Sequence, residues 1–242
     1  VTSLTTTAVV HITATIEGDS KTTTLLVSPW LTSLTLSNDT VVGGNTVGGR
    51  VNIFRNAPNG GVTVNLSSTV PTIALVPSTV VVPAGVATAT FDVVTKGVAN
   101  PQTVDISATY LGLTRTVTLT IVPARLFSLS FVPTVVSGGT DISGSVQLDG
   151  AAPTGGVTVA LASSDPAVTV PATVTILAQT SAISFTATTA FVAANTSVTV
   201  SATYGADTKT AVVDVLRANL ISLTLQPDTI QGGNITTGTV GL

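Results

Sequence analysis

Residues 57–64 read Ala-Pro-Asn-Gly-Gly-Val-Thr-Val, and residues 152–159 read Ala-Pro-Thr-Gly-Gly-Val-Thr-Val. The two blocks lie 95 residues apart and differ at one position only. Each block joins a turn of proline and glycine to a stretch in which valine alternates with threonine. Proline and glycine favour turns, and alternation with a period of two is typical of a half-buried β-strand. The block therefore predicts a repeated turn-and-strand unit, and it sets the register for the rest of the chain.

Three further sets of blocks repeat in this register. Ser-Leu-Thr-Leu at 33–36 recurs as Ser-Leu-Ser-Phe at 128–131 and as Ser-Leu-Thr-Leu at 222–225. A glycine pair follows each copy: Gly43-Gly44, Gly138-Gly139 and Gly232-Gly233. A block ending in Ala-Thr-Ile or Ala-Thr-Tyr occurs at 12–16, 106–110 and 200–204. The spacing is 94 or 95 residues throughout, and an internal repeat of that length indicates tandem domains.

The register predicts four segments. Residues 31–125 and 126–218 form two full repeats. Residues 1–30 match the end of a repeat, and residues 219–242 match the beginning of one. We therefore expect the natural polypeptide to be longer than these 242 residues, with Val1 not its natural start.

Within a full repeat, the alternation of apolar and polar residues predicts about seven strands, which is typical of an immunoglobulin-type sandwich. In the first repeat the strands are expected near 33–37, 47–54, 61–67, 78–82, 87–94, 102–110 and 114–122. The side chains expected to face inward are Leu34, Leu36, Val51, Ile53, Val62, Val64, Leu66, Ala89, Phe91, Val104, Ile106, Ala108, Tyr110, Val117, Leu119 and Ile121. Those expected to face outward are Thr63, Asn65, Thr88, Thr90, Asp92, Thr103, Asp105 and Ser107.

A resemblance to a known group supports this fold. The run Val-Thr-Val-Pro-Ala-Thr-Val-Thr-Ile at 168–176, followed by a strand rich in Ser, Ala and Phe at 181–187, resembles the bacterial immunoglobulin-like repeats of large surface proteins. The glycine-pair and Ala-Pro-x-Gly-Gly blocks resemble the same group, so the resemblance covers essentially the whole chain. It implies an all-β chain of tandem immunoglobulin-like β-sandwich domains at an extracellular or cell-surface location. Such repeats serve as stalks, spacers, adhesins and sheath proteins, so the resemblance does not select one function.

Composition removes several classes of function. Charged residues are only 8% of the chain, against about 25% in an average soluble domain, and the net charge is −3. Because no basic stripe is present, we expect no nucleic-acid partner. No long apolar run is free of Thr, Gly or Pro, so we expect no membrane span in this window. Cysteine is absent, so each domain depends on its hydrophobic core.

The residues needed for catalysis are scarce. His11 is the only histidine and Glu17 the only glutamate. The repeat register aligns His11 with Asp105 and Thr199, and three unlike side chains at one position argue against shared chemistry. Neither a Ser-His-Asp triad nor a pair of catalytic carboxylates can be assembled convincingly. We therefore predict that the chain is not an enzyme and has no catalytic, cofactor-binding or metal-binding residues, and no cofactor.

Two sets of recurring polar residues leave alternatives open. Asp39 and Asp228 align with each other and with Thr134, so they are either ligands of a calcium site at a domain junction or solvated loop aspartates. The cations Lys21, Arg115 and Lys209 also align. They are either a repeated contact to an anionic glycan or neighbouring rod, or charges that blunt an edge strand. The solvated aspartates and the blunted edge are the preferred interpretations.

The junctions between repeats, at 27–31, 121–126 and 216–220, are short and contain no flexible spacer. Pro29 and Pro123 restrict them further, so we expect the domains to form a semi-rigid rod. Trp30, the only tryptophan, lies at the first junction. It is either an exposed anchor for carbohydrate or self-assembly, or, as we prefer, a side chain packed between two domains. Four glycosylation-type sequons begin at Asn38, Asn65, Asn195 and Asn234, and in a chain so rich in Thr and Ser they are weak evidence.

Two functions fit these observations. The first is a structural repeat region of an extracellular fibre, stalk, sheath or surface layer, with self-association into a fibre or layer as the partner contact. The second is an adhesin whose repeats bind a glycan, a protein or a cell surface, or act as spacers for a distal binding domain. A binding module needs a loop that differs between repeats. The loops at 67–79 and 162–173 differ in length by one residue and contain no aromatic cluster. This similarity favours the structural role.

Overall fold

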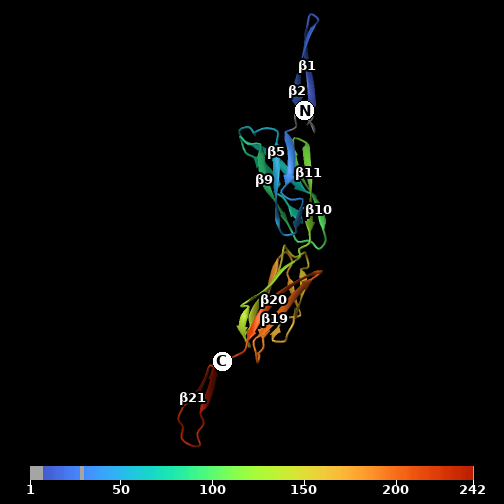
Figure 1. Cartoon of the computed structure of the whole chain (residues 1–242). Helices are drawn as coiled ribbons and strands as arrows, with labels where there is room; N and C mark the ends of the chain where they lie inside the picture. The colour runs from blue at the N-terminus through green and yellow to red at the C-terminus, as the bar shows by residue number, and fades with distance from the viewer. Residues whose placement is uncertain (1–7, 28–29, 242) are drawn as a thin grey trace. The chain divides into compact units, whose positions relative to one another are not determined.

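Every regular element within residues 8–27 and 30–241, which the computed structural model describes, is a β-strand (Figure 1). Valine and threonine dominate these strands because β-branched side chains fit a pleated surface. Nor do these residues contain a helix with the length and apolar composition that crossing a bilayer requires. The chain divides into two compact units. The first comprises Val1–Ala124, Gly150–Gly155 and Ala178–Thr180, and the second comprises Arg125–Asp149, Gly156–Leu177 and Ser181–Leu242.

The first unit holds one hairpin and one sandwich. A two-stranded sheet pairs β1 (Ala8–Ile16) with β2 (Asp19–Val27). A four-stranded sheet has the order β3 (Leu31–Leu36), β5 (Thr46–Ile53), β9 (Thr88–Thr95) and β7 (Ala74–Leu75). A five-stranded sheet has the order β4 (Thr40–Val42), β11 (Leu113–Val122), β10 (Gln102–Tyr110), β6 (Val62–Ser68) and β8 (Thr79–Val82).

This strand order is that of an immunoglobulin-like sandwich. Strands β3, β5 and β9 take the places of A, B and E in one sheet, while β6, β10 and β11 take those of C, F and G in the other. The named strands of this sandwich pair antiparallel, except β4 with β11, which pair parallel over three residue pairs. The predicted immunoglobulin-like β-sandwich fold is therefore confirmed.

The core lies between these two sheets and follows the predicted register. Val51, Val64 and Ile106 are fully buried, and Phe91 is 7% exposed. Burying each such side chain contributes about 1.5–3 kcal/mol relative to leaving it in water. Among the side chains predicted to face inward, Leu36, Tyr110 and Val117 are only half-buried, because they lie toward the margin of the core cluster. Among those predicted to face outward, Thr88, Asp105 and Ser107 are half-buried.

The second unit repeats the architecture. Its four-stranded sheet has the order β12 (Leu126–Val132), β14 (Ile142–Leu148), β18 (Ala182–Thr189) and β16 (Val168–Thr169). Its five-stranded sheet has the order β13 (Val135–Ser137), β20 (Asp207–Leu216), β19 (Thr196–Tyr204), β15 (Val157–Ser163) and β17 (Thr173–Ile176). Each strand stands where the strand nine numbers earlier stands in the first unit. The unit also holds a hairpin of β21 (Ser222–Gln226) and β22 (Thr237–Gly241).

The recurring glycine pairs form the turn that follows β4 and β13. The second glycine of each pair has a positive φ, +95° at Gly44 and +89° at Gly139. Residues with a Cβ atom rarely adopt this conformation, which explains why glycine recurs at the second position of the pair. Gly233 in the second unit's hairpin has a φ of +91° and completes the series.

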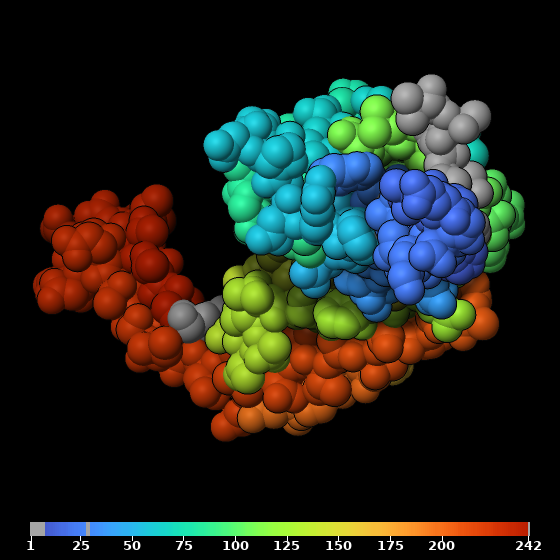
Figure 2. Space-filling model, turned by 90° about the horizontal axis from the view of Figure 1, so that it is seen from above, coloured from blue at the N-terminus to red at the C-terminus, as the bar shows by residue number. Residues whose placement is uncertain are grey.

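The two hairpins preserve the strand register of the sandwiches. In β1–β2, Ala14 lies opposite Lys21, as Ala108 lies opposite Arg115 in β10–β11 and Ala202 lies opposite Lys209 in β19–β20. Within the hairpins, however, almost every described residue is exposed. Figure 2 draws the first hairpin in blue and the second in dark red. The division into four segments at residues 30, 125 and 218 stays a prediction.

Candidate functional site

The structure places His11 on an exposed strand face, not in a cleft. Its Nδ1 atom lies 3.4 Å from the Thr24 hydroxyl on the neighbouring strand. In the first sandwich, Asp105 occupies the corresponding position and accepts a hydrogen bond of 2.6 Å from the Thr118 hydroxyl. In the second, Thr199 lies opposite Val212. In β1–β2, β10–β11 and β19–β20 this position thus faces a residue on the neighbouring strand, and its own side chain differs each time.

No metal-binding cluster forms around the aligned aspartates. Within residues 8–27 and 30–241, no three His, Cys, Asp or Glu side chains come together. The position of Asp39 is fixed by its backbone, whose carbonyl oxygen accepts a hydrogen bond of 2.7 Å from the Thr120 amide. Thr134 uses its carbonyl oxygen in the same way toward Asp214. The shared role of this position is therefore to hold the edge strand β4 or β13.

The aligned cations differ in their surroundings. Lys21 and Lys209 lie exposed on strands β2 and β20. Arg115 is half-buried, and its Nε atom donates a hydrogen bond of 3.3 Å to the carbonyl oxygen of Leu31. Only Thr120–Val122 of β11 pair with β4, so Arg115 lies on a stretch of β11 outside that pairing. This placement fits the interpretation that the charge blunts an exposed strand edge.

Trp30 packs against the first sandwich. Its ring meets Tyr110 edge-to-face with centroids 6.4 Å apart, and the Arg55 guanidinium carbon lies 5.0 Å from the Trp30 ring centroid. The Trp30 carbonyl oxygen accepts a 2.8 Å hydrogen bond from the Phe54 amide. The side chain is half-buried at the margin of the core. Ser28 and Pro29 of the predicted junction lie outside the described residues, as does Val1.

The four sequon asparagines are all exposed. Asn195 differs from the others because its side-chain oxygen accepts a hydrogen bond of 3.0 Å from the Arg217 amide. This contact ties the loop before β19 to the chain after β20, at the site described next.

In the first unit, residues 150–155 pack against the glycine-pair turn. The Ala151 amide donates a hydrogen bond of 2.8 Å to the carbonyl oxygen of Gly43. A Cβ atom on Gly44 would overlap the Cβ of Ala151, and one on Gly150 would overlap the Gly43 carbonyl oxygen. Glycine at both positions therefore allows two backbones to approach each other closely.

Gln179 strengthens this contact. Its side-chain oxygen accepts a hydrogen bond of 3.1 Å from the Gly97 amide. Its side-chain nitrogen donates to the carbonyl oxygens of Gly97, at 3.4 Å, and of Ala152, at 3.3 Å. One amide side chain thus links the loop at Gly97 to residues 150–155. We call the surface formed by Gly43, Gly44, Gly97 and the end of β11 the first socket, and it is filled.

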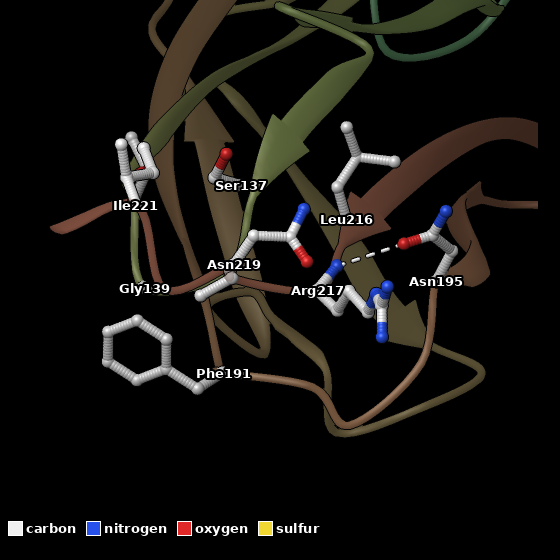
Figure 3. Close-up of a pocket in the computed structure, with 11 residues that line it drawn as sticks. Ser137, Gly139, Phe191, Asn195, Leu216, Arg217, Asn219 and Ile221 are labelled. Carbon is white, nitrogen blue, oxygen red and sulfur yellow. Dashed lines mark hydrogen bonds between the residues drawn. The ribbon is translucent and has the colours of Figure 1, made fainter. Parts of the chain in front are cut away.

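The second unit has an open counterpart, the second socket (Figure 3). It is a hollow of about 620 Å³ beside the glycine-pair turn. Figure 3 shows the Phe191 ring near Gly139 and the hydrogen bond from Arg217 to Asn195. Its lining residues are Ser137, Gly138, Gly139, Thr140, Phe191, Asn195, Leu216, Arg217, Ala218, Asn219 and Ile221. The glycine pairs are visible in the sequence as a repeat but not as parts of a site, because the partner loop at 150–155 is distant in the chain.

Comparisons with known proteins add no family. No protein-family model matches the chain, and no curated protein matches it by sequence. Solved structures do show similarity. A biofilm-associated protein (BSP domain) is 21% identical over 79% of this chain and 30% of its own, with a TM-score of 0.27. The titin domains Z1Z2 in complex with telethonin are 15% identical over 77% of this chain and 97% of their own, with a TM-score of 0.26.

An endo-fucoidan hydrolase from glycoside hydrolase family 107 is 10% identical over 89% of this chain, with a TM-score of 0.34. The match covers 34% of the hydrolase and 30% of the biofilm-associated chain, so both are much longer than the matched region. TM-scores below 0.5 do not establish a common overall arrangement. The immunoglobulin-like fold therefore rests on the strand order within each unit.

Proposed function

We propose that the chain is a structural repeat region of an extracellular fibre, stalk, sheath or surface layer. The observation that carries the proposal is the exposure of core-type side chains on the two hairpins. Ile12 is 51% exposed, whereas its counterparts Ile106 and Val200 are fully buried. Leu223 is 65% exposed, whereas its counterparts Leu34 and Leu129 are buried.

Such exposed apolar strand faces favour contact with a further polypeptide segment. Exposed apolar patches and unpaired strand edges are sites of association in soluble proteins. Each hairpin has the register of two strands of a sandwich, so the natural cover is the remaining strands of a repeat. Further repeats of the same polypeptide or a neighbouring copy would supply it. Self-association is therefore the partner contact that this proposal requires.

The low charge supports the same role. With only 8% charged residues, the sandwich faces consist largely of threonine, serine and valine. Such neutral faces can pack side by side without bringing like charges together. A role without catalysis is part of the proposal, and the scarcity of histidine and glutamate supports it. The extracellular location is proposed from the resemblance of the repeat blocks to those of surface proteins.

Electron microscopy of the native material, combined with intact mass spectrometry, tests the proposal. We expect filaments or layers built from a species heavier than the 24.1 kDa of these residues. A monomeric species of 24.1 kDa without filaments would contradict the structural role. Isolated filaments on a cell surface, which detach when a soluble glycan is added, would instead favour the adhesin.

A further inference from the structure

We propose that Gln179 is a latch that holds two later segments of the chain on the first unit. The continuous part of this unit ends at Ala124, and residues 150–155 and 178–180 complete it. When the latch opens, both segments leave the first unit while the sandwiches stay folded. The latch is independent of the proposed function, because it would act in the same way in a fibre, a stalk or an adhesin.

The backbone of Gln179 adopts a conformation that suits glycine better than glutamine. Its φ angle is +61°, in the left-handed region, which is costly for a residue with a Cβ atom. Within residues 8–27 and 30–241, two other non-glycine residues have a positive φ, Glu17 and Leu111. Each of them forms a two-residue hairpin turn with the glycine that follows, where such angles are usual. Gln179 lies instead in the connection between β17 and β18, which belong to different sheets.

The first sandwich has a glycine at the matching position. Gly85 has a φ of +82°, and its amide donates to the Ala57 carbonyl oxygen at 2.9 Å. The Gln179 amide donates to the Ala152 carbonyl oxygen at the same distance. The two turns thus share one backbone hydrogen bond and a positive φ. Because glycine forms this turn without strain, the glutamine requires a compensating interaction of its side chain.

The contacts of the Gln179 side chain with Gly97 supply this compensation. Its Oε1 atom accepts from the Gly97 amide at 3.1 Å, while its Nε2 atom donates to the carbonyl oxygens of Gly97 and Ala152. Gly97 is buried, so its amide needs an acceptor within the protein. A side chain that carries an acceptor and a donor on one carbon meets both groups of Gly97 at once.

The contact can open because its terms nearly balance. Gln179 is exposed, so water competes for its amide group. Release lets the left-handed backbone relax, whereas the hydrogen bonds to Gly97 oppose release. The Ala152 amide donates to the Thr180 carbonyl oxygen at 2.7 Å and so joins the two segments. We therefore expect them to leave together, which would also break the hydrogen bond from Ala151 to Gly43.

Amide hydrogen exchange of the full chain, followed by nuclear magnetic resonance, tests the latch. Gln179→Gly removes the side chain and leaves a residue that suits the turn. We expect the protection of the Gly97 and Ala151 amides to fall about tenfold. Protection in β10 and β19, which reports the folding of the two sandwiches, should stay the same. If glutamine merely occupied the turn, relief of the strain would leave the protection at Gly97 equal or higher, and this result would overturn the latch.

Gly85→Gln is the matched control in the first sandwich. A Cβ atom on Gly85 would meet no atom within 4 Å, so the side chain has room. It brings the strain of a left-handed glutamine without Gly97 as a partner, so the protection of the amide at position 85 should fall about threefold. Higher protection there would show that glutamine stabilises this turn by itself, and it would overturn the role assigned to the contact with Gly97.

Gln179→Glu tests the donor function of the side chain. An ionised carboxylate only accepts hydrogen bonds, whereas a protonated one has a donor and an acceptor, as glutamine does. This variant should resemble Gln179→Gly at about pH 7. It should regain most of the protection at about pH 3, below the ordinary pKa of a glutamic acid side chain, about 4.3.

The native chain and Gln179→Gly serve as references over the same pH range, since the charged residues Lys96 and Asp149 flank the contact in sequence. Protection is compared as the ratio of intrinsic to observed exchange rate, which removes the pH dependence of the exchange chemistry. If Gln179→Glu and Gln179→Gly had equal protection at both pH values, the latch would be overturned.

Discussion

At the scale of single residues, Phe91 and Phe185 mark the same place in the two sandwiches. Phe91 lies opposite Gly49 across the β5–β9 pair, and Phe185 lies opposite Gly144 across the β14–β18 pair. Phe185 also meets Phe131 edge-to-face, with ring centroids 5.8 Å apart. In both sandwiches an aromatic ring covers a glycine on the next strand, which compensates for the missing side chain.

Replacing Phe91 with alanine should destabilise the first sandwich by about 3–5 kcal/mol, because removal of the buried ring leaves a cavity. The measurement is urea unfolding followed by the fluorescence of Trp30, the only tryptophan, which packs against this sandwich. Thr88→Ala is the control on the same strand, at a position outside the core. It should change stability by less than about 0.5 kcal/mol. Comparable losses in the two variants would contradict the register of β9.

At the scale of paired strands, Gly49 and Gly144 lie opposite the two phenylalanines. The size of the side chain is as constrained at these glycines as it is at the phenylalanines. A Cβ atom on Gly49 would overlap the Phe91 ring, and one on Gly144 would overlap the Phe185 ring. We expect Gly49→Ala to cost about 1–3 kcal/mol through overpacking. The variant that combines Gly49→Ala with Phe91→Leu should lose less than the sum of the two single changes, because the smaller side chain makes room. Additive losses in urea unfolding would show that the two positions are independent.

Most strands could be predicted because their side chains alternate over many residues. Strands β4 and β7 were not predicted, since three and two residues are too few to show a period of two. Their positions depend on pairing with distant chain, as when Asp39 accepts a hydrogen bond from Thr120. Strand length thus explains why the long strands could be predicted and why β4 and β7 could not.

The sockets could not be predicted for a related reason. Gly43, Gly44 and Gly97 become a site only when residues 150–155 meet them, and no local pattern joins these segments. The change from Gly97 to Phe191 at one repeat position is visible in the sequence. The effect of this change on the site can be inferred only from the contact that Gly97 makes with residues 150–155 in the structure. For His11, in contrast, the sequence alone argues against shared chemistry, because its counterparts Asp105 and Thr199 differ.

At the scale of the whole molecule, the low charge predicts how self-association responds to salt. With charged residues at 8% of the chain, contacts between copies should depend on apolar and hydroxyl surface. Raising NaCl from about 0.05 to 0.5 M screens ionic contacts, so it should leave light scattering by the assembled material unchanged. Ammonium sulfate should increase scattering, because excluded salts strengthen burial. Dissociation in NaCl would instead indicate ionic contacts, for example through Lys21 and Lys209.

The parallel pairing of β4 with β11 has a mechanical consequence. These strands lie near the beginning and the end of the first sandwich, with Thr40, Val41 and Val42 aligned to Thr120, Ile121 and Val122. A tensile load applied at the two ends of the sandwich pulls such strands in opposite directions along their length. Their hydrogen bonds are then strained together in shear instead of opening one after another. The edge strand that is too short to predict thus becomes the part of the domain that resists extension.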